Sequence, residues 1–246
     1  MLIDAHCHIN SLSGETQKNI LNNSSGYIFI DISVDLNSSL ESISLSCSYD
    51  FVYTSLGFHP LGGRQFSSDT INKYRDFLLD NKKIVAIGEV GLDYKAALSY
   101  QQQRSILEKF ISLSKEFDLP LMLHNRWHND EIFSILDKYF TDYSKVIFHC
   151  FSQDINFLKH IIEKKGNVSF SLNILRRKNK LDEALKYIPL DNLLLETDSP
   201  YMKIYGEYSI PFDIIKVYNY TAHIRNISLD ELKNTVYSNA KRIFSF

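Results

Sequence analysis

Short apolar runs alternate with polar or amphipathic segments along the whole chain. Each run is rich in Ile, Val, Leu and Phe and is nearly continuous, which is typical of parallel strands that are buried on both faces. The pattern predicts eight such strands. They are expected at residues 2–9, 26–33, 51–59, 84–93, 120–126, 145–151, 167–172 and 192–198.

Helices are expected between the runs. Residues 101–117 repeat apolar side chains along one helical face, and Ser228 with Glu231 forms the capping-box pattern that opens a last helix. Strands that alternate with helices imply a parallel sheet, either an open doubly wound sheet or a closed barrel. The periodicity alone allows both, but 246 residues and eight strands favour the barrel, which typically needs ~250 residues. We therefore predict an α/β fold in which residues 1–246 form a single (β/α)8 TIM barrel domain.

Composition narrows the class of protein. A hydrophobic fraction of 44% suffices for a large core, and no segment approaches the ~20 apolar residues of a membrane helix. The N-terminus lacks the basic and apolar regions of a signal peptide. Cys7, Cys47 and Cys150 are odd in number and far apart, which argues against a disulfide framework and favours a reducing compartment. We therefore expect a cytoplasmic protein without membrane association.

Side chains that bind metals fall near the ends of five of the eight runs. A (β/α)8 barrel builds its active site from the carboxyl ends of several strands, so these side chains are expected to converge. Chance would place the same residue types on helices and loops as well. The candidate ligands are His6, His8, Glu89, His124, His149 and Asp198.

The His6–His8 pair has a direct geometric interpretation. Strand side chains alternate between faces, so the two imidazoles point the same way and suit one divalent cation. Asp4 shares this parity and is expected one layer deeper, as an acceptor that orients an imidazole. Alone, two histidines at a strand end are more often ordinary hydrogen-bonded residues. The further candidate ligands on matching strand ends favour the metal site.

Glu89 lies within an otherwise apolar strand. A buried carboxylate is costly unless it is paired or binds a metal, and a salt bridge would be the better interpretation if Glu89 stood alone. The neighbouring Gly88 and Gly91 leave room for a bulky centre or for close approach of another backbone. Asp93 has the same parity as Glu89 and is expected either beside the site or as a cap of the following loop.

The candidate ligands offer nitrogen and oxygen atoms and no thiolate. This set suits Zn²⁺, Mn²⁺ or Mg²⁺, and the number of histidines argues against a site for Mg²⁺ alone. One tetrahedral ion needs fewer ligands, whereas a carboxylate-bridged pair of ions ~3.5–4 Å apart uses them all. Such a pair lowers the pKa of a shared water and stabilises the attacking and leaving oxygens. The expected cofactors are therefore two divalent metal ions, and the expected chemistry is hydrolysis.

Sequence motifs over nearly the whole chain resemble those of one protein family, and they occur in the family's order. On these motifs the chain resembles the TatD family of metal-dependent deoxyribonucleases, within the amidohydrolase-like barrels. The motifs are D-A-H-C-H at 4–8, G-F-H-P at 57–60, G-E-V-G-L-D-Y at 88–94, L-P-L-M-L-H-N-R at 119–126, H-C-F-S at 149–152, L-L-E-T-D-S-P-Y at 194–201 and N-A-K-R-I-F at 239–244.

The resemblance implies two metal sites that share Glu89 as a bridging ligand. Asp198 would also act as general base for the nucleophilic water. Arg126 would contact a substrate phosphate, with a surface arginine beside a helix as the competing interpretation. His59 would lie at the rim and contact phosphate or a further metal. The first site would comprise His6, His8, Glu89 and Asp198, and the second Glu89, His124 and His149.

Three positions depart from the family's pattern. Leu61 stands where the family often has a second histidine after the third strand, and Ser209 where it has an asparagine two positions before a proline. Phe110 stands in place of a glutamine that is usual in the fourth helix. Since the candidate ligands are all present, these departures bear on substrate preference rather than on metal binding.

A local patch is needed for nucleic-acid binding, because a net charge of −2 gives no global attraction. A basic segment follows the seventh strand, where barrels often bind phosphate, and Lys203 follows the eighth. Tyr201, Tyr205 and Tyr208 are placed to stack on unpaired bases. A solvated helix start and a tyrosine-rich loop are the competing interpretation. The basic segment contains Arg176, Arg177, Lys178 and Lys180.

These features favour a metal-dependent DNase, an exonuclease that cleaves the phosphodiester bonds of DNA, single-stranded DNA above all. A second hypothesis keeps the metals but makes the substrate a small-molecule ester, amide or phosphoester, because of Leu61 and Ser209. A third makes the chain an auxiliary nuclease subunit of a larger nucleic-acid-processing or phage-defence assembly, with protein partners that the sequence does not identify. A monomer is the expected state.

Overall fold

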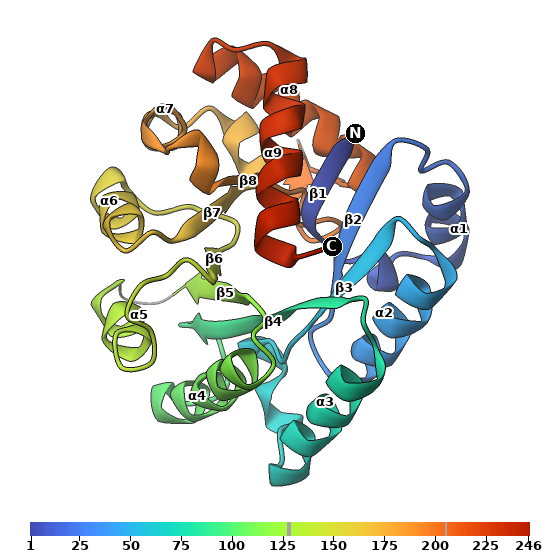
Figure 1. Cartoon of the computed structure of the whole chain (residues 1–246), viewed down its shortest axis with the longest axis vertical. Coiled ribbons are helices and arrows are strands. Elements are labelled where there is room, and N and C mark those ends of the chain that lie inside the picture. The colour runs from blue at the N-terminus through green and yellow to red at the C-terminus, as the bar shows by residue number, and fades with distance from the viewer. Residues whose placement is uncertain (127–128, 205) are drawn as a thin grey trace.

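Eight parallel strands, hydrogen-bonded in chain order, form the central sheet of the computed structural model, which describes residues 1–126, 129–204 and 206–246 (Figure 1). Each strand lies within one of the runs predicted from the sequence. The strands are β1 (Leu2–Cys7), β2 (Tyr27–Ile32), β3 (Val52–Leu56), β4 (Ile84–Asp93), β5 (Leu121–Arg126), β6 (Val146–Phe148), β7 (Asn167–Phe170) and β8 (Leu193–Leu195).

Helices surround the strands on the outside (Figure 1). A short antiparallel pair, β9 (Lys203–Ile204) and β10 (Glu207–Tyr208), interrupts the connection after β8. The α-helices are α1 (Gly14–Asn22), α2 (Leu36–Ser48), α3 (Ser68–Asp80), α4 (Tyr100–Glu116), α5 (Asn129–Leu136), α6 (Ile155–Glu163), α7 (Asn179–Tyr187), α8 (Ile214–Arg225) and α9 (Leu229–Phe244).

Hydrogen bonds between β1 and the segment after β8 close the ring of strands. The Asp198 amide donates to the His6 carbonyl at 2.9 Å, and the His8 amide donates to the Ser199 carbonyl at 2.8 Å. An open sheet would leave the edges of its first and last strands apart, whereas here the two edges satisfy each other's backbone groups. The fold is therefore the (β/α)8 TIM barrel and not the doubly wound sheet.

The two helices singled out in the sequence are confirmed. The predicted apolar face of α4 is buried against the strands, with Ile106, Phe110 and Leu113 in the core. Ser228 is the N-cap of α9, where its hydroxyl accepts a hydrogen bond from the Glu231 amide at 3.1 Å. Burial of one apolar face thus places each helix, as the periodicity predicts.

The expectations about cysteines and membrane spans agree with the structure. Cys7, Cys47 and Cys150 are all free, and Cys7 and Cys150 are buried. Within the described ranges, no helix combines the length and the apolar character that crossing a membrane requires.

Two glycines allow β4 to lie very close to β5. A Cβ atom at Gly91 would lie 1.8 Å from the His124 carbonyl oxygen, and one at Gly88 would lie 2.4 Å from the Met122 carbonyl oxygen. Both distances are far below van der Waals contact, so neither position accepts a side chain. Of the two roles considered for these glycines, the structure supports close backbone approach, which brings Glu89 and His124 together.

The Gly91→Ala variant is expected to lose about 2–3 kcal/mol of unfolding free energy, because the new methyl group forces β4 and β5 apart. Urea unfolding followed by circular dichroism measures the loss. Gly14→Ala is the matched control, since a Cβ at Gly14 meets nothing within 4 Å, and its unfolding free energy should stay within about 0.5 kcal/mol of wild type. Equal stability of the two variants would contradict the close approach of the strands.

Candidate metal centre

The predicted ligands converge at the carboxyl ends of the strands. They surround a cavity of about 480 Å³ in the mouth of the barrel. His6 is fully buried behind the cavity wall, with Nε2 at 3.2 Å from His8 Nε2. The cavity wall includes His8, Glu89, His124, His149 and Asp198, together with His59 and Arg126.

A first cluster of side chains, comprising His6, His8, Glu89 and Asp198, gathers around one oxygen of Glu89. The Glu89 Oε2 atom lies 3.5 Å from His6 Nε2 and 4.0 Å from His8 Nε2. On the other side, Asp198 Oδ1 lies 3.9 Å from His6 Nε2 and 3.7 Å from His8 Nε2. The two imidazole nitrogens are 3.2 Å apart. The imidazoles of His6 and His8 therefore point the same way, as their strand parity predicts.

A second cluster, comprising Glu89, His124 and His149, gathers around the other oxygen of the same carboxylate. The Glu89 Oε1 atom lies 2.5 Å from His124 Nδ1 and 2.7 Å from His149 Nε2. His59 joins this cluster from the end of β3, with Nε2 at 3.4 Å from Glu89 Oε1 and 3.2 Å from His124 Nδ1. Glu89 therefore stands between the two clusters, with one oxygen facing each.

Contacts on the far side of two imidazoles hold the rings with their remaining nitrogens toward Glu89. His8 Nδ1 lies 2.9 Å from the Ile32 carbonyl oxygen, and His124 Nε2 lies 2.9 Å from Asp93 Oδ2. Asp93 also accepts a hydrogen bond from the Lys95 amide at 2.7 Å. It thus fills both of the roles expected for it, beside the site and as a cap of the loop after β4.

Asp4 is fully buried beneath His6, but it does not orient an imidazole. It accepts hydrogen bonds from the Thr197 amide at 2.9 Å, the Thr197 hydroxyl at 2.5 Å and the His6 amide at 3.3 Å. The expectation was wrong because main-chain amides and a hydroxyl, and not ring nitrogens, are the donors at this depth. Asp4 instead ties β1 to the segment that carries Asp198.

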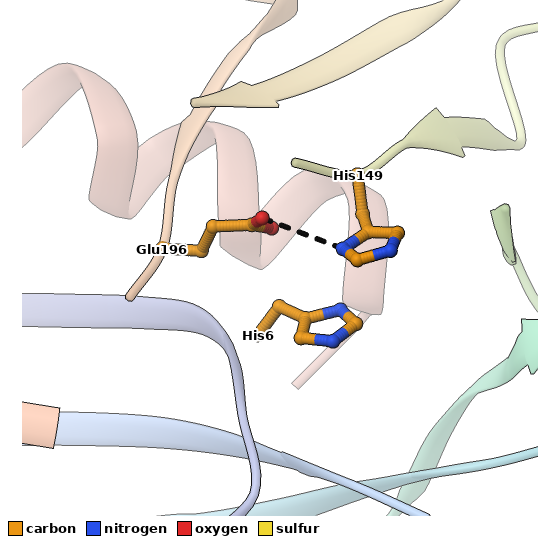
Figure 2. Close-up of side chains that lie close together, drawn as sticks. All are labelled: His6, His149 and Glu196. Atoms are coloured by element: carbon orange, nitrogen blue, oxygen red, sulfur yellow. Dashed lines mark ion pairs between the residues drawn. The ribbon is translucent and has the colours of Figure 1, made fainter. Parts of the chain in front are cut away.

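Glu196 lies behind the site, two residues before Asp198. Figure 2 shows its carboxylate beside His149, whose Nδ1 atom lies 3.4 Å from Glu196 Oε1. The Cys150 amide donates to the same oxygen at 2.7 Å. The rings of His6 and His149 are stacked with centroids 4.0 Å apart. Glu196 therefore lies where it orients His149 rather than in the cavity.

Gln103 is a second buried residue that the sequence analysis did not single out. Its Oε1 accepts from the Asp93 amide at 2.8 Å, and its Nε2 donates to the Asp93 carbonyl at 3.1 Å and to the Leu98 carbonyl at 2.9 Å. These bonds hold the loop whose carboxylate contacts His124. The available signal was a polar residue on the apolar face of α4, three positions before Ile106.

The ionised carboxylates, and the spacing of the ligands in the first cluster, fit a divalent cation. In the second cluster Glu89 lies at hydrogen-bonding distance from His124 and His149. Burial alone would raise the pKa of Glu89, but the charges of His149 and His59 and the hydrogen bonds from His124 and His149 together outweigh burial and hold that pKa well below its usual range. Burial of Asp198 is likewise outweighed by the hydrogen bond from His8 together with the charges of the surrounding histidines, so the pKa of Asp198 is lowered. Metal–nitrogen bonds of ~2.1 Å separate the ligands of a tetrahedral ion by ~3.4 Å. The first cluster, with separations from 3.2 to 4.0 Å, has room for one ion.

Arg126 lies in the cavity wall, and the loop after β6 holds its guanidinium. The Nη1 group donates to Ser152 Oγ at 2.7 Å and to the Cys150 carbonyl at 3.4 Å. The side chain is half-buried beside the second cluster rather than free at the surface. A guanidinium fixed in this way presents a positive charge to the cavity.

The three departures from the family's pattern lie in different surroundings. Leu61 lines the cavity and is 55% exposed, so a substrate meets an apolar side chain there. Ser209 is buried, and its hydroxyl donates to the Met202 carbonyl at 2.5 Å. Phe110 lies on the buried face of α4 and packs in the core. Of the three, Leu61 is the one in the described wall of the cavity.

The tyrosines after β8 lie partly at the cavity. Tyr201 lines its wall, with the ring centroid 4.8 Å from that of His8. Tyr208 is exposed and lies under the Lys203 ammonium, which is 4.1 Å from the ring centroid. Tyr205, which was expected to stack on bases with them, lies outside the described residues. The structure thus brings Tyr201 to the site.

The fold and the two ligand clusters define a metal-dependent hydrolase built on a (β/α)8 barrel. Comparison with known proteins adds the family: the family described as TatD related DNase matches residues 3–245, and the chain belongs to it. An uncharacterized metal-dependent hydrolase of Mycoplasma genitalium is 32% identical over 261 residues, which cover 98% of both chains. A second one, from Methanocaldococcus jannaschii, is 30% identical over 98% of this chain and 96% of its own length.

Two further similarities concern function and fold. A protein of Pantoea ananatis named 3'-5' ssDNA/RNA exonuclease TatD is 28% identical over 205 residues, which cover 79% of this chain and 78% of that protein. The crystal structure of YjjV, a TatD homolog from Escherichia coli, superposes with a TM-score of 0.92 at 25% identity, covering 100% of this chain and 98% of that one. These similarities agree with the barrel and with a metal-dependent hydrolase.

Proposed function

We propose that this TatD-family hydrolase is a deoxyribonuclease that removes nucleotides from the end of single-stranded DNA. The observation that carries the proposal is the position of Glu89, which turns one oxygen to each ligand cluster at the floor of a cavity. The exonuclease name of the Pantoea ananatis relative supports a nucleic-acid substrate. The cationic Arg126 in the same wall supports a phosphodiester over an uncharged ester.

Each cluster is assigned one divalent cation. His6, His8 and Asp198 would hold one ion, His124 and His149 the other, and Glu89 would bridge the two. Bound divalent ions supply Lewis-acid polarisation of the phosphodiester and a lower pKa for the attacking water. This assignment uses every ligand predicted from the sequence.

Asp198 is the residue placed to accept the proton of the attacking water. Its carboxylate faces the cavity beside His6 and His8, and its lowered pKa keeps it ionised at neutral pH. A base within one hydrogen bond of the water meets the geometric requirement for general base catalysis. Asp198 thereby acts both as a ligand and as the base.

Arg126 and His59 are assigned to the substrate phosphate. The Arg126 guanidinium is held by Ser152 and Cys150 through Nη1 and one N–H of Nη2, which leaves the Nε–H and the second N–H of Nη2 for a phosphate oxygen. His59 lies beside the second cluster with its ring at the cavity edge. Together they would orient the scissile phosphodiester against Glu89 and Asp198.

Removal of the metals tests the proposed function. Purified protein with Mg²⁺ or Mn²⁺ is expected to shorten end-labelled single-stranded DNA stepwise, and a chelator should reduce the rate by at least about 10³-fold. Readdition of metal should restore it. End-labelled duplex DNA, RNA and a panel of chromogenic esters are assayed in parallel. Activity that survives chelation, or turnover of the esters without cleavage of any oligonucleotide, would contradict the proposal.

A further inference from the structure

The basic segment that follows β7 does not form one patch. The Arg176 guanidinium turns toward Met202, with 3.6 Å between Nη2 and Sδ, and Lys180 Nζ donates to the Ser152 carbonyl at 2.5 Å. Arg177 instead lines a separate groove of about 430 Å³ between this segment and α8. None of the residues in the described wall of this groove lines the metal-site cavity.

One face of α8 forms the opposite wall of the groove. Lys216, Asn219 and His223 are spaced by three and then four positions, so they lie along one side of the helix. All three are exposed and line the groove, as does Arg177 across from them. The rim of the groove is therefore built from side chains that donate hydrogen bonds, and Arg177 and Lys216 among them carry positive charge.

The floor of the groove is apolar. Leu175, Tyr220 and Ile224 line it and are half-buried. The Tyr220 hydroxyl donates to Asp182 at 2.9 Å, so the phenol oxygen is anchored and the ring remains as a surface. An aromatic and aliphatic floor under a cationic rim suits a group with a flat face and a negative charge, as a nucleotide has.

The charge of Arg177 is not neutralised within the groove. Across the described part of the chain, no carboxylate lies within 4.0 Å of its guanidinium, whereas Lys216 pairs with Asp213 at 2.6 Å. Asp182 accepts the hydrogen bond from the Tyr220 hydroxyl and makes no ion pair with Arg177 within the described residues. A cation without a partner at the edge of a groove is available to a phosphate.

We propose that this groove, defined by Arg177, Lys216, Asn219, Tyr220 and His223, binds a nucleotide of a single-stranded substrate at a distance from the cleaved bond. The proposal rests on the proposed nuclease function. Arg176 lies next to Arg177 and reaches Met202 in the loop after β8, so a basic path leads from the region of the metal site toward the groove. A second contact on the strand would favour long substrates over short ones.

The double variant Arg177→Gln, Lys216→Gln tests the groove. For single-stranded DNA of about 16 nucleotides, kcat/KM is expected to fall about tenfold, while for a dinucleotide it should stay as in wild type. The slope of log Kd against log salt for the long strand, measured by fluorescence anisotropy with chelator present to stop cleavage, should become shallower by about 0.7, the share of one phosphate contact, because Arg177 is the unpaired cation and Lys216 already pairs with Asp213. Titration with inorganic phosphate shows whether a free anion is the ligand instead.

The control is Lys186→Gln, Lys241→Gln, which removes the same charge at the ends of α7 and α9, away from both cavities. This control should leave kcat/KM for both substrates, and the slope of log Kd against log salt, as in wild type. An equal effect of the two double variants, an equal loss on dinucleotide and long strand, or saturable binding of phosphate alone would overturn the groove proposal. Absence of cleavage at every length would refute the nuclease function instead, and the anisotropy comparison would still decide the groove.

Discussion

Glu89→Gln is expected to abolish hydrolysis and to release both metal ions. The two oxygens of Glu89 face different clusters, so its replacement by a neutral amide removes an anionic ligand from each. A loss of several kcal/mol of transition-state stabilisation corresponds to a rate reduction of at least about 10³-fold. Steady-state cleavage of end-labelled DNA gives the rate, and elemental analysis after desalting gives the metal content.

Glu15→Gln on the exposed side of α1 is the control, and it should match wild type in rate and metal content. Circular dichroism of Glu89→Gln checks that the barrel persists. If the folded variant kept two ions per chain, the bridging role of Glu89 would be refuted, whatever its rate.

Asp198→Asn is expected to separate metal binding from proton transfer. The second cluster does not include Asp198, so one ion should remain bound while the rate falls by about 10²–10⁴-fold, the usual contribution of a general base. The contrast with Glu89→Gln is the informative measurement, because that variant should lose both ions. Metal content and single-turnover cleavage, measured on the same preparations, give the comparison.

Asp191→Asn is the matched control, since Asp191 is exposed and lies before β8 at the other end of the strand. Its rate and metal content should equal those of wild type. A rate for Asp198→Asn within tenfold of wild type would rule out Asp198 as the base.

The strands and the candidate ligands were predictable because both depend on local pattern. Continuous apolar runs mark strands buried on both faces, and strand parity places His6 and His8 on one side whatever the rest of the chain does. In a (β/α)8 barrel the carboxyl ends of all strands lie at one end, so side chains from strands that are distant in the sequence meet there. Glu89 was predictable because a lone carboxylate in an apolar strand needs a compensating partner.

The supporting contacts were not predictable, because they depend on which strands become neighbours and at what depth. Asp4 meets the amide and hydroxyl of Thr197 only because β1 and the end of β8 close the barrel. Gln103 reaches the main chain of Asp93 through the packing of α4 on β4. No local pattern in the sequence encodes either pairing.

The closure of the barrel also sets the order in which the site can be assembled during synthesis. The first cluster draws His6 from the first strand and Asp198 from beyond the last, and hydrogen bonds between these two segments join them. A nascent chain therefore lacks this cluster until the ribosome has released nearly all of the barrel. An ion that binds only when β1 and the segment after β8 are paired stabilises that pairing by mass action. Bound metal would then hold the first and last strands of the barrel together. Hydrogen exchange of the Asp198 and His8 amides, which join these strands, should therefore slow when metal is added.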